Sequence, residues 1–356
     1  MLSPPDEADW LPEDRGLADR LRAGGFPQGP GAWQEIEPGG RIGRDRVGPT
    51  HLVALRDVLC DPLTGALLTR AGQVPRAPLA ETADPAAAMA ILRQEAGAAV
   101  SLDRALLFSP AGRGNYGHFI FDALTGLRAA RVLGLTDRFA PITPPLCRWQ
   151  RDLLGLTGDR VVSLPRRPAV LRIRELVYTT TMDHYLQRAG ALLAGLAGDL
   201  GRPAQRPAAA QAVYLARGLY TKRLLLGEAA LLARLRARGV RIVQPHRMSV
   251  AAQRDLMART HLLIAPSGAA LANMVFLPPG ARVIELRPET IAEPWSRVTA
   301  TTLGLHLTQI DTPARRAGEP GSLRADLMQA PRRLLGRACT QSRVDPDAVM
   351  AAYSVQ

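Results

Sequence analysis

The chain has 356 residues, 47% of them hydrophobic, and a formal net charge of +13. This length suits two packed domains better than one, and the hydrophobic content supports a folded core through most of the chain. Three widely spaced cysteines without a CxxC pair exclude a disulfide framework and a zinc site, and no apolar run approaches the ~18 residues that a membrane-spanning helix needs.

Arginine supplies nearly all of the positive charge, because Lys222 is the only lysine. Such a balance suits a phosphate-bearing ligand, an acidic polymer or an anionic membrane surface. The N-terminal segment "MLSPPDEADWLPEDRG" is acidic and proline-rich, unlike a signal peptide, so the sequence predicts a cytoplasmic protein. The aromatic content of 4% argues against stacking of bases on the protein, and no nucleic-acid partner is expected.

The first half of the chain has the pattern of an irregular lead-in followed by one domain. Residues 1–50 are rich in glycine, proline and mixed charge, which predicts a loosely ordered segment with a few short elements. Residues 51–205 are predicted to form the N-terminal domain, which ends in the proline-rich linker "GRPAQRPAAAQ". Its expected elements are two strands around the "DPLTG" turn, a strand at 105–108, a helix at 118–134, strands at 161–165 and 171–180, and a helix at 186–200.

The second half, residues 206–312, alternates strands and helices at short spacing. Strands are expected at 212–217, 240–245, 261–266, 281–286 and 306–310, and helices at 227–239, 249–260, 268–277 and 294–304. Strict alternation predicts an open parallel sheet with helices on both faces, so the fold class is α/β. Residues 313–356 form a basic tail that could pack back across the N-terminal domain.

Small side chains directly follow the predicted strand at 261–266. Ser267, Gly268 and Ala269 open the next helix, and ligands of such sheets bind beyond the carboxyl ends of the strands. Tiny side chains let a ligand approach the backbone, while the first-turn amides and the helix dipole favour an anion such as a diphosphate. Tight packing of the helix on the strand selects the same residues, and this alternative stays open.

Charged residues are expected at the same edge of the sheet. Arg217 ends its predicted strand and could hold a phosphate through two parallel bonds, with Lys222 and Arg223 within reach. Glu285 lies near the end of another strand, where a carboxylate suits a ribose diol. An ordinary strand-end charge is the alternative for Glu285.

The stretch "GRGNYGHFIFDAL" carries the candidates of the first domain. Gly112, Gly114 and Gly117 match the GxGxxG spacing of a dinucleotide fingerprint, so an NAD(P)-dependent oxidoreductase that uses Gly112–Gly117 is an alternative function. His118 and Asp122 are four residues apart and therefore share a helix face. Such a pair could take a proton from an acceptor hydroxyl. A helix cap beside a buried histidine is the structural alternative.

Other catalytic motifs are missing from the sequence. Ser267 is not in a GxSxG elbow, His246 and His261 lack metal-ligand spacing, and no Walker pattern occurs. We therefore expect no metal site and no cofactor. A non-enzymatic module that binds polyanions through its arginines is a further alternative.

Several of these segments together resemble glycosyltransferase family 61, a pattern also seen in bacterial capsular-polysaccharide-biosynthesis-like proteins. The resemblance is carried by "VYLAR", by "GVRIVQPHRMSVAAQRDLMARTHLLIAPSGAALANMVFLPPGARVIELRPE" and, upstream, by "NYGHFIFDAL", and it covers about residues 105–290. The chain departs from the family at Ser267, where histidine is frequent, and at Gly227, where asparagine often precedes the residue matching Glu228.

The resemblance implies a GT-B-like α/β fold, with two Rossmann-like domains and a cleft between them. It implies an inverting transferase that works without a metal and takes a nucleotide-sugar as co-substrate, with residues 206–312 as the donor domain and 51–205 as the acceptor domain. It assigns the diphosphate to Arg217 and the nucleoside to Glu285. The turn with Gly268, Ala269 and Asn273 matches the family's glycine-alanine turn and its asparagine.

His118 and Asp122 match the upstream motif of the family, and the resemblance implies that they face the acceptor. The expected function is transfer of a sugar from a nucleotide-sugar donor to a hydroxyl of a cell-surface glycan or glycolipid. Arg223 and Ser267 complete the expected donor site. A glycolipid acceptor would add a peripheral contact with an anionic membrane on its cytoplasmic side.

Overall fold

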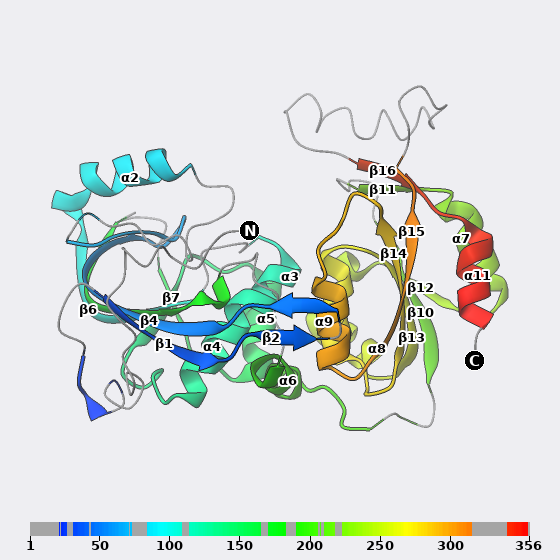
Figure 1. The fold of residues 1–356 in the computed structure, drawn as a ribbon, viewed down its shortest axis with the longest axis horizontal. Helices are drawn as coiled ribbons and strands as arrows, with labels where there is room; N and C mark the ends of the chain where they lie inside the picture. The colour runs from blue at the N-terminus through cyan, green and yellow to red at the C-terminus, as the bar shows by residue number, and fades with distance from the viewer. Residues whose placement is uncertain are drawn as a thin grey trace. The chain divides into compact units, whose positions relative to one another are not determined.

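The computed structural model describes residues 21, 23–26, 31–42, 44–70, 72, 84–108, 114–164, 170–182, 190–205, 207, 210–217, 223–314 and 340–354. The chain forms two compact units, unit 1 (Met1–Asp199) and unit 2 (Leu200–Gln356) (Figure 1). This division precedes the expected one at 205/206, because Arg202 is bonded within unit 2. Its Nε donates to the Leu277 carbonyl at 2.7 Å and another nitrogen donates to the Leu303 carbonyl. Both carbonyls lie at helix C-termini, which attract a cation.

Unit 1 is built around one mixed sheet. In chain order its elements are β1 (Gly31–Glu37), β2 (Gly40–Ile42), β3 (Asp45–Val47), β4 (Thr50–Asp61), β5 (Ala66–Leu68), α2 (Pro85–Gln94), η2 (Ala96–Ala98), β6 (Val100–Leu107), α3 (Tyr116–His118), the π-helix η3 (Phe119–Leu124), α4 (Thr125–Val132), β7 (Ala140–Thr143), α5 (Arg148–Thr157), β8 (Val162–Ser163), β9 (Leu171–Thr179), η4 (Thr180–Met182) and α6 (Gly190–Asp199).

The sheet of unit 1 has a parallel part and an antiparallel part. Its order is β1-β4-β9-β6-β7-β8, with β5 also paired to β4. Strands β9, β6, β7 and β8 run parallel, whereas β4 is antiparallel to both β9 and β1. The chain passes from β6 to β7 and β8 on one side and returns to β9 on the other. The strand order therefore reverses between β6 and β9, and such a switch point is where α/β sheets bind ligands.

The first strand of this sheet lies where the sequence predicted an irregular lead-in. Strand β1 pairs with β4 from Gly31↔Leu55 to Glu37↔Thr50. Residues 31–37 therefore belong to the sheet, although their sequence "GAWQEIE" lacks a clear apolar–polar alternation and is flanked by glycines and prolines. Residues 1–20 lie outside the described part of the chain.

Unit 2 repeats a strand–helix alternation. Its elements are β10 (Gln211–Leu215), β11 (Arg223–Leu226), α7 (Glu228–Ala237), β12 (Arg241–Val243), η5 (Pro245–Arg247), α8 (Val250–Met257), β13 (Thr260–Pro266), the 3-10 helix η6 (Ala269–Phe276), β14 (Arg282–Pro288), α9 (Trp295–Thr302), β15 (His306–Thr312), β16 (Thr340–Arg343) and α11 (Pro346–Ser354).

The open parallel sheet predicted for this half is confirmed. Its order is β12-β10-β13-β14-β15, with every pair parallel. Helices α7 and α11 cover one face, and α8 and α9 cover the other (Figure 1). The face toward α7 and α11 buries Tyr214, Ile264 and Ile284 in one apolar cluster. Since β10 lies between β12 and β13, the strand order reverses between β10 and β13, which is the switch point of unit 2.

The described residues of the C-terminal segment pack within unit 2. Strand β16 pairs in parallel with β11, from Arg223↔Thr340 to Leu226↔Arg343. Val349 and Met350 of α11 are buried in the same cluster as Tyr214. Apolar side chains of residues 340–354 thus complete this core, whereas residues 315–339 lie outside the described part. Packing of the tail against the first domain stays a prediction.

Candidate functional site

Arg217 and the turn after β13 meet at the switch point of unit 2. Arg217 follows β10, while Ser267 and Gly268 follow β13. Arg217 Nη2 donates to the Ser267 carbonyl, and Nη1 donates to the Arg223 carbonyl at 2.7 Å. Four of the residues predicted from the sequence, Arg217, Arg223, Ser267 and Gly268, are therefore brought together.

The electrostatics of this cluster favour an anion. The pKa of Arg217 is lowered to about 10, mainly by burial and also by the positive charge of Arg223, while Tyr214, Glu228 and Glu285 act in the opposite direction. Arg217 stays protonated at neutral pH. Two neighbouring guanidinium groups repel each other, and a bound phosphate would relieve that repulsion.

Gly268 is required by its conformation and by its neighbour. Its φ of 152° and ψ of −175° lie in a region that is essentially restricted to glycine. A Cβ added here would lie 3.1 Å from Arg217 Nη2. The helix that follows is a 3-10 helix and not the expected α-helix, and it begins at the exposed Ala269.

Ser267, a member of this cluster, has a buried side chain. It is 0% exposed, and its hydroxyl has no hydrogen-bond partner among the described residues. An unsatisfied buried hydroxyl costs about 1–3 kcal/mol. A ligand that reached this position would find a ready donor.

Asn273 and Glu285 are hydrogen-bonded to other residues of unit 2. Asn273 Nδ2 donates to Gln253 Oε1 at 2.9 Å and to the Ala270 carbonyl at 2.9 Å, which ties η6 to α8. Glu285 is 1% exposed, and its Oε2 accepts from Ser296 Oγ at 2.6 Å and from Gln309 Nε2 at 2.8 Å. Glu285 is thus buried and already bonded through one oxygen, and a ribose diol at this carboxylate stays a prediction.

Glu228 lies beside Arg217, although the sequence did not single it out. Tyr214 Oη donates to Glu228 Oε1 at 2.7 Å, and the backbone N–H of Arg217 donates to the same carboxylate. Burial raises the pKa of Glu228, and these two hydrogen bonds partly counteract that rise. The signal available in the sequence was an acid in the first turn of a helix beside the strand-end arginine.

Gly227 precedes Glu228 with a φ of +84°. Asparagine tolerates this left-handed conformation better than most residues, so glycine is a conservative exchange for the asparagine frequent in the resembled family.

The predicted dinucleotide turn of unit 1 is capped by its own side chain. Gly112 lies outside the described residues. Asn115 Oδ1 accepts from the backbone N–H of Gly117 at 2.9 Å and of His118 at 3.5 Å. These are the first-turn amides that a pyrophosphate would need, so the helix start is already satisfied.

His118 and Asp122 form a hydrogen-bonded pair at the start of the π-helix η3. His118 Nδ1 lies 2.9 Å from Asp122 Oδ2, and the side chains are 30% and 5% exposed. A carboxylate at Nδ1 favours the tautomer that carries its proton there, so Nε2 is the nitrogen suited to accept a proton. π-helical turns are rare and frequently lie at functional sites.

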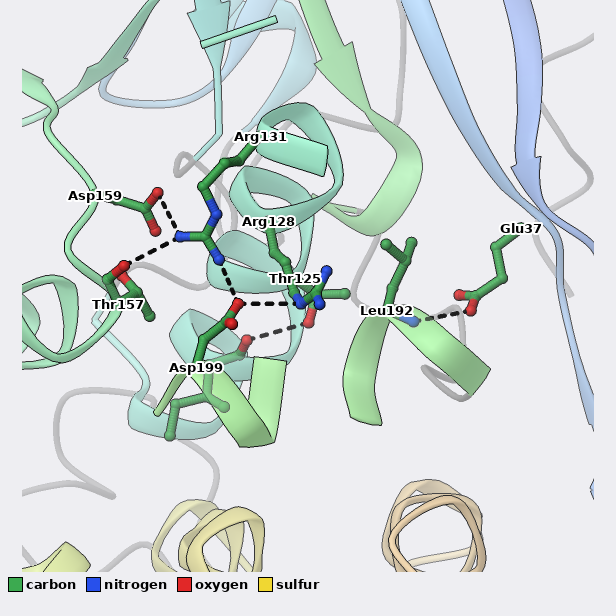
Figure 2. A network of polar contacts seen from close by, with 9 residues as sticks. Glu37, Thr125, Arg128, Arg131, Thr157, Asp159, Leu192 and Asp199 are labelled. Atoms are coloured by element: carbon green, nitrogen blue, oxygen red, sulfur yellow. Dashed lines mark hydrogen bonds and ion pairs between the residues drawn. The ribbon is translucent and has the colours of Figure 1, made fainter. Parts of the chain in front are cut away.

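The helix that carries this pair is anchored on three sides. Gly126 of α4 packs so closely that an added Cβ would lie 2.4 Å from the hydroxyls of both Thr179 and Thr181. Arg131 of α4 donates to Asp159 Oδ1 at 2.8 Å and also to Asp199 at the end of α6 (Figure 2).

Two further contacts of Figure 2 hold α6 in place. Arg128 Nε lies 3.1 Å from Asp199 Oδ2, and the backbone N–H of Leu192 donates to Glu37 Oε1 at 3.1 Å (Figure 2). The carboxylate of Glu37 thus lies near the N-terminus of α6, where the helix dipole favours a negative charge. The anchors fix the helix of His118 relative to the sheet of unit 1.

No described helix is both long and apolar enough to traverse a lipid bilayer. Within the described ranges, no group of three or more His, Cys, Asp or Glu side chains could hold a metal ion. Asp345 and Asp347 have the spacing of an Asp-x-Asp pair, but they begin α11. Asp345 Oδ1 accepts from the Asp347 backbone N–H at 2.8 Å, and the Asp347 carboxylate pairs with Arg234.

The family model described as Glycosyltransferase 61 matches residues 116–284. The matched segment begins in α3, two residues before His118, and ends one residue before Glu285. It contains both clusters described above, together with Glu228. No curated protein matches the chain significantly. This match, over just under half of the chain, is to the glycosyltransferase 61 family, and it indicates a glycosyltransferase with a donor and an acceptor substrate.

Proposed function

We propose that the protein transfers a sugar from a nucleotide-sugar to a hydroxyl of a glycan or glycolipid, with inversion at the anomeric carbon and without a metal ion. The observation that carries this proposal is the cluster of Arg217, Arg223 and Gly268 at the switch point of unit 2. The proposed fold is GT-B-like, with one Rossmann-like domain in each unit. The parallel strands of each unit, with their own switch point, support it.

The donor half of the mechanism depends on charge. As the bond between the anomeric carbon and the diphosphate breaks, negative charge develops on the leaving oxygen. Arg217 and Arg223 would stabilise that charge, and the helix start at Gly268 would add backbone donors. Electrostatic stabilisation of this kind is usually the largest contribution to such a rate.

The acceptor half depends on His118. Its Nε2 would take the proton of the acceptor hydroxyl as that oxygen attacks the anomeric carbon from the side opposite the diphosphate. Asp122 holds the ring through Nδ1 and would stabilise the positive charge that the ring then acquires. The proton leaves on His118 and the electron pair of the broken bond leaves on the diphosphate.

The acceptor class also suggests a location. A glycolipid acceptor would hold the enzyme at an anionic membrane surface in the cytoplasm, and the excess of arginine supports such a contact.

A panel of UDP-, GDP- and CMP-sugars, with NADPH alongside, tests the proposal. Stabilisation of the protein by one nucleotide-sugar, followed by sugar transfer to an added acceptor, is expected. Arg217→Ala should lose this stabilisation, whereas Arg259→Ala, a change at an exposed arginine of the same unit, should keep it. Stabilisation by NADPH alone would favour an oxidoreductase, and salt-sensitive binding of any polyanion without a donor effect would favour a binding module.

A further inference from the structure

Glu228 lies where α7 begins, next to the end of β11 and to the segment that follows β16. It is the first residue of α7, and it follows Gly227 at the end of β11. A Cβ added at Gly227 would lie 3.1 Å from the Val344 carbonyl, and the Val344 N–H donates to the Leu226 carbonyl at 3.0 Å. The C-terminal segment thus holds the start of α7 in place, and with it the carboxylate of Glu228.

From this fixed position Glu228 reaches the end of β10. Tyr214 is fully buried in the core, and its hydroxyl donates to Glu228 Oε1 at 2.7 Å. The backbone N–H of Arg217 bonds the same carboxylate. One side chain therefore contacts Tyr214 within β10 and also Arg217, two residues after the end of the strand.

The guanidinium and the main chain of Arg217 are held by different partners. Both of its terminal nitrogens donate to carbonyl oxygens, those of Ser267 and Arg223. The backbone of Arg217 is held by Glu228, and the negative charge of Glu228 offsets part of the repulsion from Arg223. Without Glu228 the buried cation would keep its carbonyl partners but lose the anchor of its main chain.

We propose that Glu228 is a positioning residue that holds Arg217 in the geometry that binds the donor diphosphate. This inference rests on the proposed function. It distinguishes Glu228 from an ordinary helix-terminal acid, which would act on the helix dipole alone. The positioning role predicts weaker binding when Glu228 is neutralised. Charge alone predicts the opposite, because removal of a carboxylate beside an anion site would by itself strengthen anion binding.

The test compares binding of UDP, GDP, ADP, dTDP and CMP by calorimetry. Glu228→Gln keeps the shape of the side chain but replaces one acceptor oxygen with a donating amide. We expect its Kd for the nucleotide that the wild type binds to rise about tenfold, since a hydrogen bond to a charged group is lost. Tyr214→Phe should give a smaller rise, in the same direction.

A control variant and a double-mutant cycle distinguish a loss of positioning from a general loss of stability. Asp347→Asn removes an acid from the first turn of α11, also beside an arginine, and should leave Kd unchanged. Glu228→Gln combined with Arg217→Ala should bind no more weakly than Arg217→Ala alone, because Glu228 acts through Arg217. Additive losses would overturn the inference, as would tighter or unchanged binding by Glu228→Gln.

Failure of the proposed function has a different signature. If Arg217→Ala binds the nucleotide as well as the wild type, or if the wild type binds no nucleotide of the panel, the donor site itself is wrong. If Glu228→Gln does not fold, Tyr214→Phe decides, since it removes only the hydroxyl and preserves the packing of the ring. Wild-type binding by that variant would then contradict the positioning role.

Discussion

The switch points of the two units share a topology and differ in chemistry. In each unit a glycine-containing turn follows a parallel strand at the place where the strand order reverses. In unit 1 the side chain of Asn115 occupies the first amides of the helix, and a histidine–carboxylate pair follows. In unit 2 the helix begins after Gly268, and arginine side chains lie beside it.

We infer from this difference that the sheet topology sets the position of the site, while the capping residue decides whether the helix amides remain available to a ligand. A side chain that satisfies its own helix start leaves little for an anion. A glycine with two neighbouring cations leaves the helix start to a ligand. The following substitutions test this difference between the two units, in order of decreasing expected effect.

His118→Ala should have the largest effect. Loss of a general base lowers kcat by about 10²–10⁴-fold, and Asp122→Asn should lower it less, because the ring remains but its orientation and tautomer are no longer fixed. Steady-state kinetics with saturating donor measures both. A His118→Ala variant with the wild-type kcat would exclude this residue as the base.

Gly268→Ala tests the approach of backbone and arginine in unit 2. The added Cβ would lie 3.1 Å from Arg217 Nη2 and 3.9 Å from Arg223 Nη1. We expect the donor KM to rise by about 10–100-fold, as for the loss of a charge-assisted bond. Gly239→Ala is the control, since Gly239 has a φ of +73° with no neighbour within 4 Å. It should destabilise the backbone without changing KM; equal KM changes in both variants would refute the specific role.

Gly126→Ala tests the packing beneath His118. Alanine normally stabilises a helix interior by ~1 kcal/mol relative to glycine. Here the Cβ would meet Thr179 and Thr181 at 2.4 Å, and overpacking should reduce the free energy of unfolding by about 1–3 kcal/mol. Gly155→Ala on α5, with open space around it, should instead increase it. Urea denaturation of both variants gives the sign of the change in the free energy of unfolding. Stabilisation by Gly126→Ala would show that the helix is not held tightly on η4.

Asn115→Ala should have the smallest effect. Loss of the cap should reduce the free energy of unfolding by about 1 kcal/mol, whereas Asn115→Asp should retain the cap through its carboxylate. Thermal denaturation compares the two. If both variants are equally destabilised, the amide of Asn115 has a role other than capping.

The sequence by itself determined the α/β class and the layout of unit 2. Strict alternation of short apolar runs and amphipathic segments is a local pattern, and it located β10, β12, β13, β14 and β15 and the helices between them. The spacing of His118 and Asp122 also predicted their contact, because residues four apart on a helix are neighbours. Arg217 and Gly268 could be placed at one edge because parallel strands end on the same side.

Only the tertiary structure decided which of these residues form hydrogen bonds inside the fold. Glu285 is bonded by Ser296 and Gln309, and Asn273 is bonded by Gln253. The pairing of β11 with β16 and the bond between Arg217 and Ser267, fifty residues apart, likewise left no mark in the local pattern. The physical reason is that periodicity reports which face of an element is buried, whereas hydrogen-bond partners are set by long-range packing that one segment cannot encode.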